Sequence, residues 1–194
     1  MKSIILSCTP AECEKIVNGD MSILVRKVVP KEVPFKAYIY CTKTKNKWSL
    51  CDYEGAYQNS EGEIVYAQQH VIGEFICDRI DRIKKRGINN NFDYCYLSLN
   101  EWGNDDIEIE IKDIQKSCIS KSELNAYGEN SSCLYGLHIS DLKIYDKPKP
   151  IMQFYKPCPI KIKNCPVCEL YSTYTGCCMN NIDRPPKNYI YVEE

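Results

Sequence analysis

The pattern of hydrophobic and polar positions marks six short segments of the chain as β-strand candidates. These segments are residues 3–7, 23–29, 36–42, 63–78, 133–145 and 188–192. Residues 36–42 and 133–145 alternate with the period of two that is typical of half-buried strands. Within residues 133–145, the alternation places Leu134, Gly136, His138, Ser140 and Leu142 on one face. The pattern therefore predicts a protein built mainly from short strands.

Two capping signals predict helices between these strands. Thr9 precedes Pro10 and is followed three residues later by Glu12, which together resemble the start of a helix over residues 10–18. Ser120 and Glu123 repeat the signal and predict a short helix that stops at residue 128. Many short strands with few helices indicate an α+β fold around a curved sheet or small barrel.

Composition divides the chain near residue 146. Prolines restrict residues 147–159 to an extended linker or edge chain without regular structure. We therefore predict a barrel domain over residues 1–146 and a Pro- and Cys-rich extension over residues 147–194 that ends in a closing strand. The basic run at residues 79–86 and the acidic run at residues 101–110 are typical of solvated faces.

Charge and hydropathy narrow the function classes. The 25 Lys and Arg residues against 26 Asp and Glu residues argue against a protein that coats nucleic acid through charge alone, but they allow a local basic groove. No apolar run approaches the ~20 residues of a membrane-spanning helix, and the apolar run at the N-terminus is too short for a signal peptide. We therefore expect a cytoplasmic protein without a membrane partner.

Thirteen cysteines are an unusually large and odd number, which favours thiols or a metal site in a reducing compartment over a disulfide framework. Five of them cluster near the C-terminus, at Cys158, Cys165, Cys168, Cys177 and Cys178. The Cys-x-x-Cys spacing predicts a structural zinc site held by Cys165, Cys168 and one or both of Cys177 and Cys178, with Cys158 competing for the fourth position. Free thiols are the alternative.

The chain resembles the ASCH domains of the PUA-like superfamily, and in its last segment their phage and prophage branch. The resemblance rests on six segments in this order: residues 17–20, 22–27, 35–42, 71–75, 137–145 and 184–194. It implies a PUA-like β-barrel of about five to seven strands with flanking helices, and a cleft for RNA or a modified nucleoside.

Some small ASCH proteins are amidohydrolases that act on an N-acylated cytidine. Their motif, Gly-x-Lys-x-x-(Glu or Thr)-x-Arg, corresponds here to residues 19–26. Gly19 and Arg26 match this motif, whereas Met21 replaces the Lys and Leu24 replaces the Glu or Thr. Neither replacement can serve as acid, base or nucleophile. The departure therefore argues against catalysis, and we assign no catalytic residue.

Eight residues are candidates for ligand binding. Arg26 lies among apolar strand residues and needs an acid such as Glu74, a carbonyl or a phosphate as its partner. His138 is either a satisfied core histidine or a ligand contact. Alternating lysines near an aromatic residue form a modest nucleic-acid signal or an ordinary solvated hairpin. The full set is Ser22, Arg26, Lys43, Lys45, Lys47, Trp48, Glu74 and His138.

Three functions remain open on the sequence alone. The leading hypothesis is a non-enzymatic module that binds RNA, a modified nucleobase or a nucleotide-derived ligand. The second is an amidohydrolase that acts on an acylated cytidine through other residues. The third is a phage accessory protein that binds a host protein or sequesters a nucleotide signal.

Overall fold

The computed structural model describes residues 1–43, 55–88, 91–97, 115–157 and 181–193. The chain forms two compact units that interleave along the sequence. Unit 1 comprises Met1–Glu14, Phe35–Glu74 and Lys143–Glu194, and unit 2 comprises Lys15–Pro34 and Phe75–Leu142. The predicted boundary near residue 146 stays a prediction.

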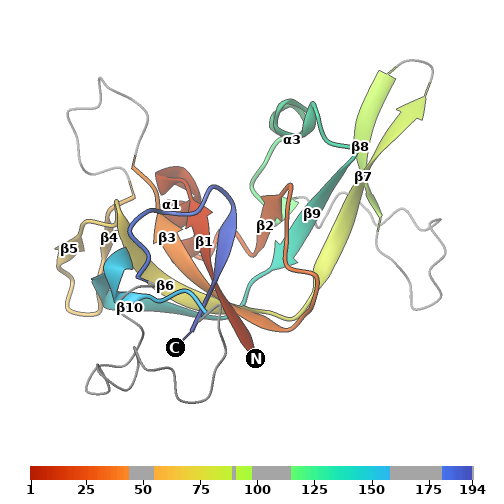
Figure 1. The fold of residues 1–194 in the computed structure, drawn as a ribbon. Coiled ribbons are helices and arrows are strands. Elements are labelled where there is room, and N and C mark those ends of the chain that lie inside the picture. Colours follow the sequence, from red (N-terminus) through yellow and green to blue (C-terminus); the bar gives the residue numbers. More distant parts are fainter. Residues whose placement is uncertain (44–54, 89–90, 98–114, 158–180, 194) are drawn as a thin grey trace. The chain divides into compact units, whose positions relative to one another are not determined.

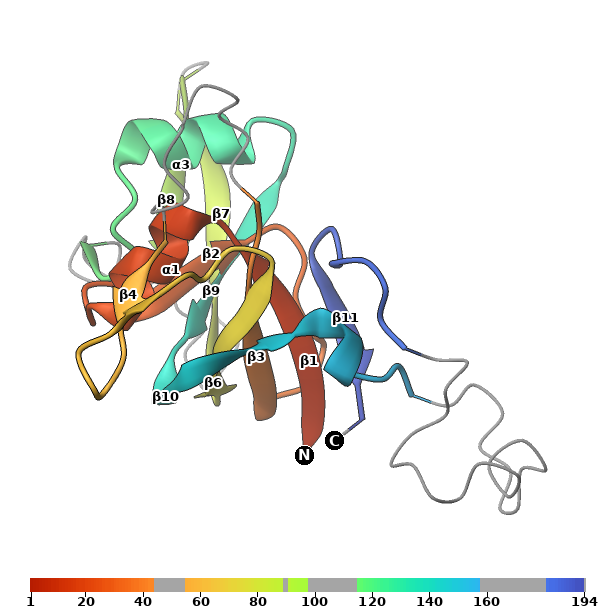
Figure 2. The ribbon, with the colours of Figure 1, turned by 90° about the vertical axis from the view of Figure 1, so that its left-hand side faces the viewer.

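A five-stranded sheet with the strand order β10-β6-β3-β1-β11 dominates unit 1, and Figure 2 shows β6, β3, β1 and β11 from left to right. Their bounds are β1 Lys2–Cys8, β3 Phe35–Cys41, β6 His70–Cys77, β10 Ser140–Pro150 and β11 Tyr189–Val192. β1 pairs parallel with β3 and antiparallel with β11. A short hairpin of β4 (Tyr57–Gln58) and β5 (Ile64–Val65) completes the described strands of unit 1.

One face of this sheet carries an apolar core. Ile5, Tyr38, Val71 and Val192 pack there with Phe154, which follows the short 3-10 helix η1 (Ile151–Gln153). The rings of Tyr38 and Phe154 meet edge to face, with centroids 4.8 Å apart. This geometry adds specific packing to the area that the two rings bury.

Helix α1 (Pro10–Val17) begins where the capping signal predicts. The backbone N–H of Thr9 donates to Glu12 Oε2 at 2.8 Å, and the N–H of Glu12 donates to Thr9 Oγ1 at 3.2 Å. These reciprocal bonds satisfy two donors that the first turn of a helix leaves without intrahelical partners.

Unit 2 contains a four-stranded antiparallel sheet in the order β2-β9-β7-β8. Its strands are β2 Ile23–Arg26, β7 Ile80–Ile88, β8 Asn91–Leu97 and β9 Cys133–His138, and β7 and β8 form the long hairpin of Figure 1. Helix α3 (Lys121–Gly128) starts at the predicted Ser120 cap. Its Leu124 packs against Val25, Ile83 and Leu134 on one face of the sheet.

The predicted α+β class is confirmed: the described residues are mostly strand, with α1 and α3 as their α-helices. In the described part of the chain, no helix is long and apolar enough to cross a membrane.

Three local predictions need correction. Residues 79–86 belong mostly to β7, in which Arg82 is exposed, as expected for a solvated face, but Asp81 is only 5% exposed. Residues 133–145 do not form one strand. The strand pairing is interrupted at Ile139, between β9 and β10, and Asp141 just after it has a φ of +47°. Ser140 and Leu142 therefore start a new strand instead of continuing the face of His138.

The third correction concerns residues 147–150, which were expected to form an extended linker or edge chain without regular structure. They continue β10 as far as Pro150. β10 is an edge strand, with β6 as its neighbour on one side only. Prolines are tolerated in it because the backbone N–H that a proline lacks is not needed on the open side.

Candidate functional site

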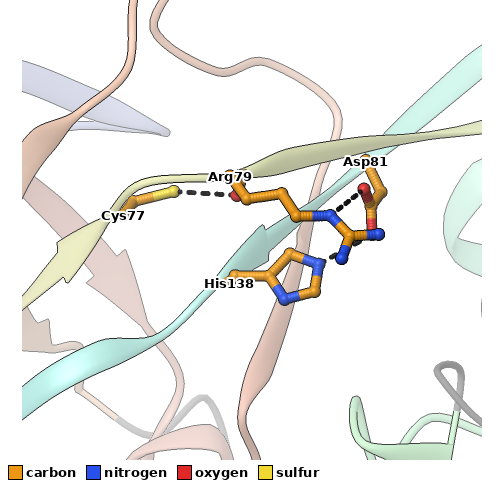
Figure 3. A network of polar contacts seen from close by, with 4 residues as sticks. All are labelled: Cys77, Arg79, Asp81 and His138. Atoms are coloured by element: carbon orange, nitrogen blue, oxygen red, sulfur yellow. Dashed lines mark hydrogen bonds and ion pairs between the residues drawn. The ribbon is translucent and has the colours of Figure 1, made fainter. Parts of the chain in front are cut away.

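A buried carboxylate at the start of β7 binds two basic side chains of unit 2, as Figure 3 shows. His138 Nε2 lies 2.7 Å from Asp81 Oδ2. The Arg79 guanidinium holds both carboxylate oxygens, with Nε 2.8 Å from Oδ1 and Nη2 3.1 Å from Oδ2. The backbone N–H of His138 also donates to the carbonyl oxygen of Arg79 at 3.1 Å. The network therefore joins β7 to the last residue of β9.

The ionisation of Asp81 follows from these contacts. Burial acts to raise the pKa of Asp81, but hydrogen bonds from His138 and Arg79 outweigh it, so the pKa lies below its ordinary value. An ionised carboxylate can only accept hydrogen bonds. Nε2 of His138 therefore carries a proton, and the imidazole is held in a fixed orientation.

The two nearest nucleophile candidates are not activated by this histidine. The Cys77 thiol is buried and donates to the carbonyl oxygen of Arg79 at 3.3 Å. Burial raises the pKa of Cys77 to about 12, so the thiolate is scarce at neutral pH. The Ser140 hydroxyl donates to the carbonyl oxygen of Ile76 at 2.8 Å. The network is therefore suited to orienting an imidazole and stabilising the sheet, and no nucleophile–base pair is assigned to it.

A second feature lies on the opposite face of the same sheet. In the strand register, Tyr135 of β9 stands directly opposite Arg26 of β2 on one side and Arg82 of β7 on the other. Directly opposed residues of antiparallel strands project to the same face with Cβ atoms about 5 Å apart. We call Arg26, Tyr135 and Arg82 the Arg–Tyr row.

Exposure increases along the Arg–Tyr row. Arg26 is 7% exposed and its Nη1 donates to the carbonyl oxygen of Val25 at 2.7 Å, whereas Tyr135 is half-buried and Arg82 is exposed. Guanidinium groups bind phosphate through two parallel hydrogen bonds and stack on planar rings. A tyrosine ring offers a base a stacking surface. The Arg–Tyr row therefore combines phosphate-binding guanidinium groups with a ring on which a base can stack.

Two other predicted ligand residues have defined surroundings. Ser22 is half-buried, and its backbone donates to the Lys116 carbonyl oxygen and accepts from Ile139. Glu74, in unit 1, accepts from the Tyr145 hydroxyl at 2.5 Å and lies 4.0 Å from the Lys36 ammonium. Its base partner is thus Lys36, where the sequence suggested Arg26.

The remaining predicted residues are not brought into either feature. Lys43 is exposed just after β3, in unit 1, and Lys45, Lys47 and Trp48 lie outside the described residues. The five C-terminal cysteines, from Cys158 to Cys178, also lie outside them, so the zinc site stays a prediction. Within the described ranges, no group of three or more His, Cys, Asp or Glu side chains is arranged to hold a metal ion.

Sequence reasoning missed Asp81, Arg82 and Tyr135. The basic run around Arg82 suggested a solvated surface, although Ile80 and Ile83 within it were a sign that part of it is buried. Asp81 and His138 are 57 positions apart, and their contact depends on the pairing of β7 with β9. Local pattern does not predict such a pairing.

Comparison with known proteins finds matches among solved structures only. No family model matches the sequence, and no curated protein matches it. Among solved structures, the crystal structure of ASCH from Zymomonas mobilis is similar to this chain, with a TM-score of 0.48 and 13% identity over 100% of this chain and 89% of that chain. A mutant form of that protein gives a TM-score of 0.47 and 13% identity over 100% of this chain and 92% of its own. Because one fold hosts many functions, function has to be argued from the residues of this chain.

Proposed function

We propose that this protein is a binding module for single-stranded RNA and that the Arg–Tyr row is its contact surface. The observation that carries the proposal is the placement of Tyr135 between two arginines on one sheet face. A base would stack on Tyr135, and the exposed Arg82 would bind the adjacent phosphate. The more buried Arg26 lies on the other side of Tyr135 and would hold the stacked base in position.

The two positions at which this chain departs from the amidohydrolase motif support binding over catalysis. Met21 is 3% exposed and Leu24 is fully buried, so neither side chain offers a reactive group to a ligand. The alternative of an acylated-cytidine amidohydrolase would have to use other residues. The oriented imidazole of His138 is the strongest described candidate for acid–base chemistry in that alternative.

Fluorescence anisotropy with a labelled single-stranded RNA of eight nucleotides tests the proposal. Tyr135→Leu removes the stacking surface and should weaken binding at least about fivefold, since stacking of one base contributes ~1–3 kcal/mol. Arg82→Lys keeps the charge but loses the planar donor pair, so it should weaken binding at every salt concentration, and Arg26→Lys should do the same. Arg184→Met is the control, because Arg184 is an 89% exposed arginine of unit 1.

The outcomes discriminate among the three functions. If Tyr135→Leu and Arg82→Lys bind the RNA as tightly as wild type, the Arg–Tyr row is not the contact surface. The same conclusion follows if Arg184→Met weakens RNA binding equally. Turnover of an N-acylated cytidine above background would favour the amidohydrolase. Absence of RNA binding together with retention of one defined host protein on the immobilised chain would favour a phage accessory protein.

A further inference from the structure

Strand β7 carries basic residues beyond the Arg–Tyr row. Arg82, Lys84 and Arg86 occupy every second position of this strand. Alternate residues of a strand belong to the same face of its sheet, so Lys84 and Arg86 follow Arg82 on the face of the row. Lys85 belongs to the opposite face, together with Ile83. Three consecutive basic residues of β7 are thus divided between the two faces of the sheet.

The sheet narrows to two strands just after Lys84. β9 pairs with β7 from Ile80 as far as Lys84, which stands opposite Cys133, the first residue of β9. Beyond Lys84, β7 pairs with β8 alone and forms the outer part of the β7–β8 hairpin of Figure 1. Lys84 therefore lies in the next row beyond Arg82, which is the last row of this sheet to span three strands.

An acidic residue of β8 compensates the charge of Arg86. In the strand register, Asp93 stands directly opposite Arg86, whereas both residues opposite Lys84 are cysteines, one of β8 and one of β9. Directly opposed residues have Cβ atoms about 5 Å apart, and diagonal neighbours such as Lys84 and Asp93 about 7–8 Å. The shorter distance favours the pair of Arg86 and Asp93. The positive charge that remains on this face of β7 belongs to Arg82 and Lys84.

The acid next to Arg82 in the sequence does not neutralise it. Arg82 is exposed, and in the described part of the chain its guanidinium has neither a hydrogen bond nor an ion pair. Asp81 belongs to the opposite face, where Arg79 and His138 bind its carboxylate. Arg82 can therefore give its planar donors to a ligand.

We infer that the bound RNA continues from the Arg–Tyr row along β7, and that Lys84 binds the phosphate next to the one at Arg82. The inference rests on the proposed function of the row. Residues two positions apart in a strand are separated by about 6.7 Å. This spacing is close to that of successive phosphates in an extended single strand, so Arg82 and Lys84 can contact adjacent phosphates while a base stacks on Tyr135. The contacts end at Lys84, because Arg86 has Asp93 opposite it.

Fluorescence anisotropy with the same labelled RNA, repeated over a series of KCl concentrations, tests the inference. Each phosphate contact with a single strand adds about 0.7 to the steepness with which log affinity falls against log salt. Lys84→Met should therefore reduce this steepness by about 0.7 and weaken binding roughly fivefold at about 0.1 M salt, with the difference vanishing near 1 M. Lys84→Arg keeps the charge and should retain the steepness of wild type.

Two variants serve as controls. Lys85→Met is the matched control, because it removes the same charge at the next position of β7, on the opposite face. The double variant Arg86→Met with Asp93→Asn removes one charge of each sign at directly opposed positions. Both variants should bind the RNA within about twofold of wild type and keep its salt dependence, since charges more than ~10 Å apart are largely screened at 0.1 M salt.

The outcomes separate this inference from the proposed function. An unchanged salt dependence for Lys84→Met would overturn the path along β7, and so would an equal reduction by Lys85→Met or by the double variant. A loss of affinity that persists near 1 M salt would show that Lys84 does not act through a phosphate. If Tyr135→Leu weakens binding while Lys84→Met does not, this inference fails and the Arg–Tyr row stays the contact surface. If wild type does not bind the RNA, both fail.

Discussion

Replacing Asp81 by alanine removes the acceptor that joins β7 to His138 and Arg79. The side chain of Asp81 is 5% exposed, that of His138 is 21% exposed and that of Arg79 is 51% exposed. A hydrogen bond between a charged group and a buried partner contributes about 1.5–3 kcal/mol, whereas a half-exposed ion pair contributes roughly 0–1 kcal/mol. We therefore expect Asp81→Ala to lower the free energy of unfolding of unit 2 by about 2–4 kcal/mol at pH 7.

The same contacts predict the pH dependence of this loss. Hydrogen bonds from His138 and Arg79 lower the pKa of Asp81 in the folded state despite its burial. The stabilisation is therefore fully present above the unfolded-state value of about 3.9 and is lost as the pH falls through the lower folded-state pKa. The difference in stability between wild type and Asp81→Ala should narrow below pH ~4.

Urea unfolding followed through the NMR peak intensities of both units measures this difference residue by residue. Asp183→Ala is the control, because the Asp183–Arg184 pair is 3.9 Å long and both side chains are more than three-quarters exposed, at 77% and 89%. That variant should stay within about 0.5 kcal/mol of wild type. The reasoning is refuted if Asp81→Ala also stays within this range at pH 7, or if its deficit does not narrow in acid.

Two further predictions concern unit 1 and the buried thiols. A Cβ at Gly73 would lie 2.5 Å from a backbone carbonyl oxygen of β10, so Gly73→Ala should cost about 2–3 kcal/mol. Gly62→Ala should cost only about 1–2 kcal/mol, since Gly62 has φ +80° and nothing within 4 Å of the added atom; thermal unfolding that ranks the two the other way would contradict this. Hydrogen bonds with the Cys41 and Cys8 thiols, and then burial, raise the pKa of Cys13 well above its ordinary value. Peptide mass spectrometry after iodoacetamide treatment at pH 8 should therefore find Cys118 alkylated long before Cys13, and equal rates in the native protein would be inconsistent with this burial.

Elements whose formation depends on residues close together in the sequence could be predicted from it. The Thr9 and Ser120 caps place the starts of α1 and α3 correctly, because their hydrogen bonds span only three residues. The strand candidates at residues 3–7, 36–42 and 188–192 likewise correspond to β1, β3 and β11 within one or two residues at each end. In each of these cases the signal and the structure lie within the same short segment of chain.

The pattern of charges predicted strands less well than the pattern of apolar residues did. The basic run that contains Arg79 and Arg82 looked like a solvated surface, but its apolar residue Ile83 is fully buried in unit 2. Burial of one face of β7 leaves the other face to its charged residues, so a charged segment can still form a strand at the centre of a sheet. The number of charges in a segment does not distinguish a fully solvated segment from a strand with one buried face.

The sequence by itself thus determined the α+β class, the helix starts and several strands, since local hydrogen bonds and short apolar segments produce them. Only the tertiary structure decided which strands are neighbours, and with that the candidate sites. Tyr135 lies between Arg26 and Arg82, and His138 meets Asp81, because β9 pairs with β2 on one side and with β7 on the other. Such pairings join residues far apart in the chain, and their register follows from the packing of the whole sheet.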